Sequence, residues 1–248
     1  MALHLHTSGV LLERCAEEVS RTFSRVIVSL DGADEQTYRE IRGVGALRSV
    51  ERGVARVRAL KPELPITARS TLHRLNYREV PHLIQHARAM CLDGISFLPA
   101  DTESRAFGRS RPADASNLAL DREQIVEFAD VIERTIVECA ADFASGFIAE
   151  SPEKLRRIPQ HYAARAGLAP YPTVACNAPY MSVVIEADGE VRPCFFHTSL
   201  GSIRRSTLAS IIERQIPAFR GILSVDENPI CQRCVCSMKT GWRSAPWL

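Results

Sequence analysis

Three cysteines stand within six residues near the end of the chain, in the segment "NPICQRCVC" of residues 228–236. Cys231 and Cys234 are separated by two residues, a spacing that lets one tight loop present two thiolates to a single centre. Cys236 is a further thiol, either a substitute ligand or a neighbour of the site. The spacing predicts a metal site. The alternative is an exposed redox or incidental cluster, in which three free thiols would be prone to oxidation.

Two more cysteines flank a predicted β-hairpin upstream. Residues 182–196, "SVVIEADGEVRPCFF", contain two short strand-like runs around Asp188-Gly189, a dipeptide that favours a tight turn with positive φ. Cys176 precedes the first run and Cys194 ends the second, so folding the hairpin returns Cys194 to the end nearer Cys176. With the later pair they supply four ligands, enough for zinc or for an iron–sulfur cluster. Sulfur ligands alone do not decide between the two.

The remaining candidate groups near or away from this set are weaker. His197 follows Cys194 by three residues and is a candidate further ligand or cluster neighbour, with a hydrogen-bonded structural histidine as the alternative. Cys15, Cys91 and Cys139 are solitary in the sequence, and we expect each to be a small buried apolar side chain.

Composition excludes several classes of partner. The chain has 248 residues, 46% of them hydrophobic, and 31 basic residues against 29 acidic ones, which gives a net charge of +2. Basic residues form no stripe or tail, so we expect no nucleic-acid partner. No apolar run reaches the roughly 18–20 residues needed to cross a bilayer, and no secretory signal opens the sequence. The eight cysteines are therefore expected in a reducing cytoplasm, where metal binding is favoured over disulfides.

Strand-like and helical segments alternate in the first hundred residues. Strands are predicted at residues 2–9, 25–32, 64–74 and 93–100, and helices at residues 10–23, 49–60 and 77–90. This alternation predicts parallel strands joined by right-handed crossovers, and hence an α/β sheet or barrel wall. A long helix is expected from Leu120 to about Phe143.

Near Pro170 the alternation of strands and helices gives way to a hairpin and cysteine-rich segments. This change predicts a main domain at residues 1–169 and a small second domain at residues 170–248. In the second domain a helix is expected at residues 206–223, with Ser206 as its N-cap.

The hairpin segment resembles a known type of domain. "CNAPYMSVVIEADGEVRPCFF" is similar to the start of the auxiliary-cluster domain called SPASM, or twitch in its one-cluster form, which follows many radical S-adenosylmethionine (SAM) enzymes. That family has a cysteine, a spacer and then Gly-x4-Cys, to which Cys176, Gly189 and Cys194 correspond. "NPICQRC" is similar to its closing Cys-x2-Cys.

The front half resembles the barrel of the same enzymes. "VIVSLDGADEQTYREIRGVGAL" is similar to the fourth-strand segment, and "TARSTLHRLNYREVPHLIQHARAMCLDGISFLP" to the fifth and sixth βα units. "LHTSGVLL" is similar to the third-strand turn. The resemblance covers most of residues 3–108 and 174–236. It implies a partial (βα) barrel of the radical SAM type, followed by a small cysteine-rich β-hairpin/helix domain.

The resemblance also implies site residues. An auxiliary [4Fe–4S] cluster would have Cys176, Cys194, Cys231 and Cys234 as ligands, with Cys236 as a substitute for the last. Four cysteine ligands would favour electron transfer over substrate binding.

Polar residues after the barrel strands are implied to line the SAM site. Ser29 and Arg42 match positions that contact the methionine carboxylate or ribose of SAM. Asp31 lies in the same loop, with a structural role in the Asp-Gly turn as the alternative. Asn76 is a further candidate, with helix capping as the alternative.

One expected motif is missing. The Cys-x3-Cys-x2-Cys motif does not occur in the sequence; in the family it holds the cluster that reduces SAM to methionine and a 5′-deoxyadenosyl radical. We therefore expect the polypeptide to start at about the third βα unit, and SAM and a second [4Fe–4S] cluster to bind only if the missing part is present. The segment "ALHLH" would then be an uncovered edge, either paired to another molecule or frayed.

Two functional hypotheses result. In the first, the chain is the C-terminal part of a radical SAM enzyme that acts on a peptide or a small molecule and receives electrons from a donor protein. In the second, it is a non-catalytic iron–sulfur or zinc-binding module used for electron transfer or protein binding.

Overall fold

The computed structural model describes residues 2–104, 106–107 and 117–237, and the chain divides into two compact units. The first unit consists of residues 1–100 and 118–166, and the second of residues 101–117 and 167–248. The predicted domain boundary near Pro170 therefore lies close to a boundary between the two units. Residues 101–117 belong to the second unit rather than the first.

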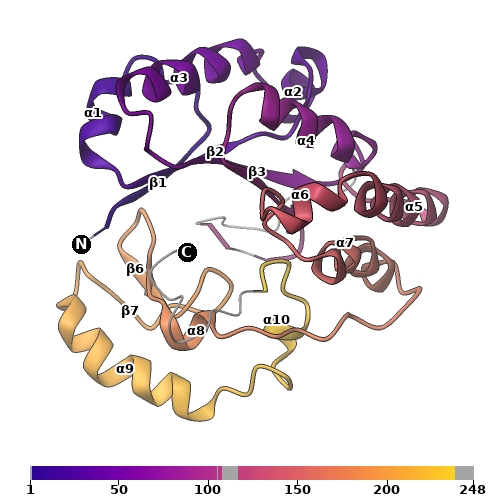
Figure 1. The fold of residues 1–248 in the computed structure, drawn as a ribbon. Coiled ribbons are helices and arrows are strands. Elements are labelled where there is room, and N and C mark those ends of the chain that lie inside the picture. The colour runs from indigo at the N-terminus through magenta and orange to yellow at the C-terminus, as the bar shows by residue number, and fades with distance from the viewer. Residues whose placement is uncertain (1, 105, 108–116, 238–248) are drawn as a thin grey trace. The chain divides into compact units, whose positions relative to one another are not determined.

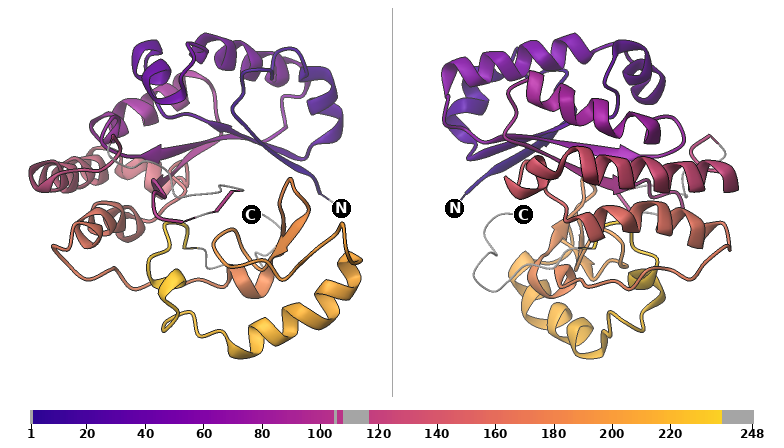
Figure 2. Two further views of the ribbon diagram at one scale, coloured as in Figure 1. Left: turned by 180° about the vertical axis from the view of Figure 1, so that it is seen from behind. Right: turned by 45° about the vertical axis from the view of Figure 1, so that its right-hand side comes forward.

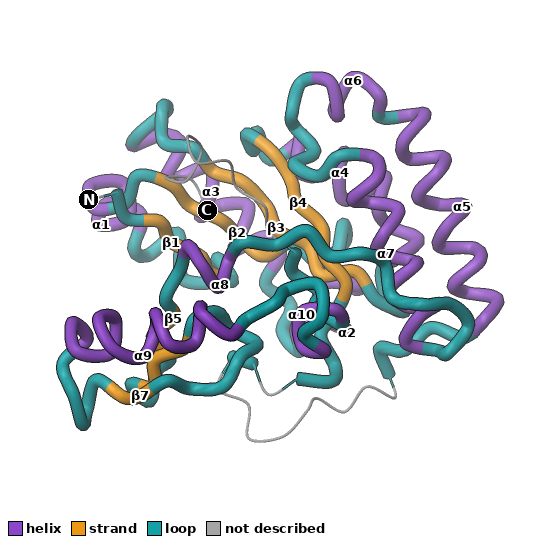
Figure 3. The backbone as a smooth tube through the Cα atoms, turned by 90° about the horizontal axis from the view of Figure 1, so that it is seen from below, coloured by secondary structure: helices purple, strands orange, loops and turns teal. Residues whose placement is uncertain are grey.

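The first unit is built on a parallel sheet whose strands follow the order β1-β2-β3-β4. Figure 3 shows the four strands side by side in orange. Their bounds are β1 His4–Thr7, β2 Arg25–Ser29, β3 Ile66–Leu72 and β4 Gly94–Pro99. All four predicted strands are confirmed; β-branched and apolar residues dominate β2, β3 and β4, and a polar or glycine-containing loop follows each strand. A parallel bridge from Ile95 to Ile148 extends pairing beyond β4.

Helices follow the strands and cover one face of this sheet (Figure 1). The helices of the unit are α1 Ala16–Thr22, α2 Glu35–Arg42, α3 Leu47–Leu60, η1 Tyr77–Glu79, α4 Val80–Ala89, α5 Arg122–Glu138, α6 Ala140–Ala144 and α7 Pro152–Arg165. Alternate strand residues such as Val26, Val28 and Ile66 are fully buried, which places the apolar core on one face. The sheet and its crossovers have the α/β class that the sequence predicts.

Several helix boundaries differ from the prediction. Residues 10–15 form turns, so α1 is shorter than the predicted segment 10–23. The long helix expected at 120–143 is interrupted at Cys139, which leaves helical geometry with φ −104° and ψ 26°. Helices α2 and α7 were not predicted. In α2 only Tyr38 is buried, and the helix contains few apolar residues to mark it in the sequence.

The segment His4–Thr7 forms strand β1, and one edge of this strand pairs with β2 along its whole length. The expectation that this segment is frayed is therefore wrong for His4–Thr7. Pairing of its other edge with a second molecule stays a prediction.

The second unit contains a three-stranded antiparallel sheet of β5 Val184–Ile185, β6 Glu190–Arg192 and β7 Gly201–Ser202. The predicted hairpin is confirmed, since β5 pairs with β6 across a turn in which Gly189 has φ +91°. The helices of this unit are α8 Ala178–Met181, α9 Leu208–Ile222 and α10 Pro229–Gln232. Helix α9 contacts β7, and Figure 2 shows the hairpin in orange and α9 in yellow.

The N-cap of α9 is Thr207 rather than Ser206. The Thr207 side chain accepts a hydrogen bond from the Ser210 N–H at 3.2 Å, and Thr207 has the extended backbone geometry of a cap residue. The sequence "RSTL" offers two adjacent cap-forming residues, and propensity alone does not choose between them.

Replacing Thr207 with alanine is expected to destabilise the second unit by about 1 kcal/mol, because the first turn of α9 loses its side-chain acceptor. The matched Ser206→Ala change should leave the free energy of unfolding within about 0.5 kcal/mol of the parent value. Urea unfolding followed by circular dichroism measures both. Equal losses in the two variants would contradict the assignment of the cap.

Two of the three solitary cysteines are not buried as expected. Cys15 and Cys91 are exposed, and Cys139 is partly buried. Cys91 has φ +55° in the turn after α4, where the family resemblance would place glycine, and this turn directs its side chain to the surface.

Within the described residues, no helix is long and apolar enough to cross a bilayer.

Candidate metal centre

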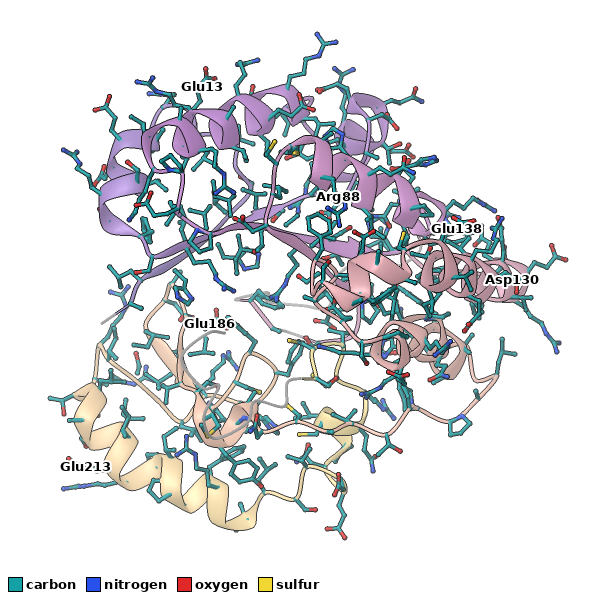
Figure 4. All side chains as sticks on the ribbon, viewed as in Figure 1. Glu13, Arg88, Asp130, Glu138, Glu186 and Glu213 are labelled. Carbon is teal, nitrogen blue, oxygen red and sulfur yellow. The ribbon has the colours of Figure 1, made fainter. Side chains whose placement is uncertain are left out.

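The five cysteines of the predicted site all lie in the second unit. Cys176 precedes α8, Cys194 follows β6, and Cys231 lies within α10. Cys234 and Cys236 follow α10 directly. Cys231 is buried and the other four are partly buried. Figure 4 shows several sulfur atoms, in yellow, around α10. Hairpin and C-terminal loop thus bring thiols from two remote parts of the sequence into one region.

The pKa values of these thiols show that they share one electrostatic neighbourhood. Burial raises the pKa of Cys194, and the nearby Cys176 and Cys236 raise it further. Burial likewise raises the pKa of Cys231 to about 11, with Cys194 and Cys176 adding to the effect. The pKa of Cys234 is raised most strongly, by burial and then by Cys236, Cys176 and Cys194. Buried thiolates repel one another, so these cysteines favour the protonated form and would release protons on binding a metal.

The sulfurs are gathered but not closed around one point. Among residues 2–104, 106–107 and 117–237, no three His, Cys, Asp or Glu side chains converge tightly enough to hold a single metal ion. A zinc site has its sulfurs about 2.3 Å from the ion, which would require these side chains to move together. The donor set itself fits a soft centre, because thiolates select zinc and iron–sulfur clusters.

Local hydrogen bonds fix the loops that carry the thiols. Asn228 caps α10 by accepting from the N–H groups of Ile230 and Cys231, at 3.0 and 3.3 Å. This cap orients the first residue of the Cys-x2-Cys pair. The Cys236 N–H lies 3.3 Å from the Cys234 sulfur and donates to it. The role of Asn228 was not predicted, although the Asn-Pro dipeptide at residues 228–229 is a typical helix-start signal.

The hairpin end is fixed by a second set of bonds. Ser182 Oγ donates to the carbonyl oxygens of Ala178, at 2.8 Å, and of Pro193, at 3.1 Å. Backbone N–H groups of Phe196 and His197 are directed at the Cys194 sulfur, and they act to lower its pKa against the effect of burial. Backbone N–H groups beside a sulfur favour its thiolate form.

In the first unit, the predicted polar residues lie where β2 and β3 end. Asp31 is buried, with 4% of its surface exposed, and accepts a hydrogen bond from the Thr71 N–H at 2.7 Å. Arg42, the last residue of α2, forms an ion pair with Asp31. Burial raises the pKa of Asp31, while Arg42 and the Thr71 N–H act to lower it. The arginine is thus held by a carboxylate of its own unit.

Gly32 allows the Asp31 loop to approach α2. A Cβ atom at position 32 would lie 2.4 Å from the Tyr38 backbone nitrogen, closer than real Cβ contacts come. The Asp-Gly sequence therefore serves close packing here, which supports the structural alternative for Asp31.

Asn76 is committed to the backbone. Its amide N–H2 group donates to the carbonyls of Asp31 and Thr71 at 2.8 and 3.1 Å, and its oxygen accepts from the His73 N–H at 2.8 Å. It makes no side-chain cap to η1, so the capping alternative is wrong. Only 1% of its surface is exposed. The residue fastens the ends of β2 and β3 together.

Ser29 ends β2 on the other face of the sheet from the core. It is paired in register with Arg69, which is paired in turn with Ser96. Arg69 Nε donates to Ser96 Oγ at 3.2 Å. All three are partly buried, so this face of the sheet carries a polar row beside the Asp31 loop. The predicted residues of the SAM site are therefore neighbours along the carboxyl ends of adjacent strands.

His73 gives this region a pH dependence. Burial and then Arg42 lower its pKa from 6.5 to about 4, and its Nδ1 accepts from the Leu75 N–H at 3.2 Å. Because the folded state holds this imidazole neutral, its contribution to stability is present above pH 6.5 and is lost as the pH falls toward 4. The full loss is roughly 3 kcal/mol.

A His73→Asn variant should show a smaller loss of stability between pH 7 and pH 4.5 than the parent chain. Asp31 has a raised pKa and acts in the opposite direction on acidification, but it is common to both chains. Urea midpoints measured across this pH range test the difference. If the urea midpoints of the two chains fell equally with pH, His73 would not be the cause of the stability loss on acidification.

Two kinds of solved structure share the fold of this chain. His6-tagged anSMEcpe with bound AdoMet has a TM-score of 0.57 and 18% identity, over 88% of this chain and 58% of that one. SuiB of Streptococcus suis bound to S-adenosylmethionine has a TM-score of 0.53 and 12% identity, over 94% of this chain and 53% of that one. The chain thus spans little more than half the length of either protein.

Sequence comparison identifies one type of domain in the chain. Residues 176–235 match SPASM, an iron–sulfur cluster-binding domain. The second unit therefore carries a segment similar to the SPASM iron–sulfur domain, and the chain shares its fold with the two solved proteins. A probable GTP 3′,8-cyclase of Methanococcus vannielii is 43% identical over 53 residues, which cover 21% of this chain and 18% of that protein. The SPASM match begins at Cys176 and includes Cys194, Cys231 and Cys234, whereas Cys236 lies just beyond its end.

Proposed function

We propose that this SPASM domain binds one auxiliary [4Fe–4S] cluster through Cys176, Cys194, Cys231 and Cys234, in the one-cluster, twitch-like form. The observation that carries the proposal is the placement of these four cysteines, buried or partly buried, in the second unit and within a segment that matches an iron–sulfur cluster-binding domain. When bound, such a cluster exchanges one electron at a time.

Cys234 is proposed as the fourth ligand in preference to Cys236. The Cys234 thiol interacts electrostatically with both Cys176 and Cys194, and burial is the main cause of its strongly raised pKa. It also receives the Cys236 N–H, a bond that would support a thiolate. In this arrangement Cys236 supplies a backbone donor beside the cluster rather than a ligand.

We propose further that the chain is the C-terminal part of a radical SAM enzyme. Its first unit would contribute Ser29 and Arg42 to SAM binding, with Asp31 and Asn76 holding the strand ends in place. The likeness in fold to two proteins solved with bound SAM supports this role. An arginine anchored on one side by Asp31 keeps further N–H groups for a carboxylate.

A peptide is the first candidate substrate. Native anSMEcpe was solved with bound AdoMet and a Cp18Cys peptide, and SuiB with its precursor peptide SuiA, and both share the fold of this chain with TM-scores of 0.57 and 0.52. A small molecule is the alternative, since the relative from Methanococcus vannielii is named as a cyclase of GTP. A redox protein would be the electron donor in either case.

The second candidate function is a non-catalytic iron–sulfur or zinc module. It rests on the sequence, because Cys-x3-Cys-x2-Cys does not occur within these 248 residues. The reading frame upstream of Met1 separates the candidates. An in-frame Cys-x3-Cys-x2-Cys would support the enzyme, and a stop codon directly upstream would support the module.

Anaerobic purification of the full chain, followed by iron, sulfide and zinc analysis, tests the cluster itself. We expect about four irons and four sulfides per chain. One zinc with no sulfide would remove the redox role and favour the zinc module.

A further inference from the structure

His197 occupies a fixed position beside the cysteines. It is buried, with 3% of its surface exposed, and its ring packs edge-on against Phe219 of α9 with centroids 5.0 Å apart. Arg192 Nη1 donates to its carbonyl oxygen at 2.8 Å, and its own N–H is directed at the Cys194 sulfur. Ring and backbone are therefore both held, so the imidazole has little freedom to turn away.

The imidazole Nε2 lies 3.3 Å from the Cys231 sulfur. This separation is a hydrogen-bonding distance for sulfur, and the two residues stand 34 positions apart in the sequence. A metal-bound cysteine is a thiolate with no proton to give, so Nε2 must be the donor once Cys231 is a ligand.

We propose that His197 is a positioning residue that donates a hydrogen bond from Nε2 to the Cys231 thiolate and thereby raises the reduction potential of the auxiliary cluster. The inference rests on the proposed cluster. A reduced cluster carries one more negative charge than the oxidised one, and a donor aimed at a ligand sulfur stabilises the more negative state. His197 is thus a side chain through which substitution can adjust the potential.

Two substitutions separate the hydrogen bond from packing. His197→Phe keeps a ring against Phe219 and removes the donor, while His197→Gln restores an N–H donor without the ring. Each full-length variant is reconstituted anaerobically beside the parent chain. Iron and sulfide content, circular dichroism and an EPR-monitored redox titration are measured for all three.

The Phe variant is expected to keep its iron and to have a lower midpoint potential. The change corresponds to roughly a tenfold smaller ratio of reduced to oxidised cluster at a given potential, or about 59 mV for one electron. The Gln variant should recover most of this shift. Loss of iron in the Phe variant alone, with the Gln variant fully loaded, would also support a donor role.

Two results would overturn the inference and leave the proposed function intact. Equal midpoint potentials in fully loaded parent and Phe chains would show that the bond does not act on the cluster. Loss of iron in both folded variants would make His197 a ligand instead of a positioning residue. Failure of the parent chain to bind a cluster would contradict the proposed function itself.

Discussion

Replacing Cys194 with serine is expected to abolish the cluster, reducing iron from about four to less than one atom per chain after anaerobic reconstitution. Cys194 interacts electrostatically with each of the other four cysteines, Cys176, Cys231, Cys234 and Cys236. A serine hydroxyl is a harder donor that stays protonated at neutral pH, and its oxygen cannot replace the thiolate in a soft site. Iron and acid-labile sulfide analysis gives the result directly.

The matched control is Cys91→Ser. Cys91 is exposed and belongs to the first unit, whereas the candidate ligands belong to the second. It should retain the full complement of iron, which excludes a general effect of removing a thiol. A Cys194→Ser chain that kept all its iron would contradict the ligand set.

Replacing Asn76 with alanine is expected to destabilise the first unit by about 4 kcal/mol. The change leaves two carbonyls and one N–H without their partner at a site that is 1% exposed, and each unmet buried group costs roughly 1–3 kcal/mol. Because these groups belong to the loops after β2 and β3, the strand ends that carry Asp31 should loosen as well. Urea unfolding followed at 222 nm reports on this unit, which contains α1 to α7.

Asn117→Ala is the corresponding control, since Asn117 is exposed. Its free energy of unfolding should change by less than about 0.5 kcal/mol. If Asn76→Ala were equally mild, the three hydrogen bonds would not be the fastening that the structure shows.

The strands were accessible from the sequence because local patterning determines them. Val26 and Val28 alternate with less buried residues and mark β2, and the Asp188-Gly189 turn marks the hairpin. Such features depend on neighbouring residues alone. The parallel order of the sheet also followed, since strands that alternate with helices seldom pair otherwise.

Helices with little apolar surface were not accessible in the same way. Helix α2 begins with an Asp34 cap and ends at Gly43 in the left-handed region, and these caps define it better than its periodicity does. Helix α7 starts at Ser151-Pro152, another cap signal, and contains Pro159 within it, which argues against a helix in a single sequence. Both would have been found from caps rather than from hydrophobic spacing.

The residues of the candidate site could be predicted from the sequence, but most of their contacts could not. Cys-x2-Cys and the hairpin geometry nominated the thiols, whereas the contact of His197 with Cys231 joins residues 34 positions apart and has no local signal. The same holds for Asn76, whose partners at positions 31 and 71 are set by the pairing of β2 with β3. Tertiary packing decides such pairs, so sequence spacing alone cannot.

X-ray absorption at the iron edge of the anaerobically reconstituted full chain tests the central claim most directly. A cluster held by four cysteines predicts a first shell of sulfur alone, together with scattering between neighbouring iron atoms. A first shell dominated by nitrogen and oxygen, or iron without iron neighbours, would contradict an all-thiolate cluster in this domain.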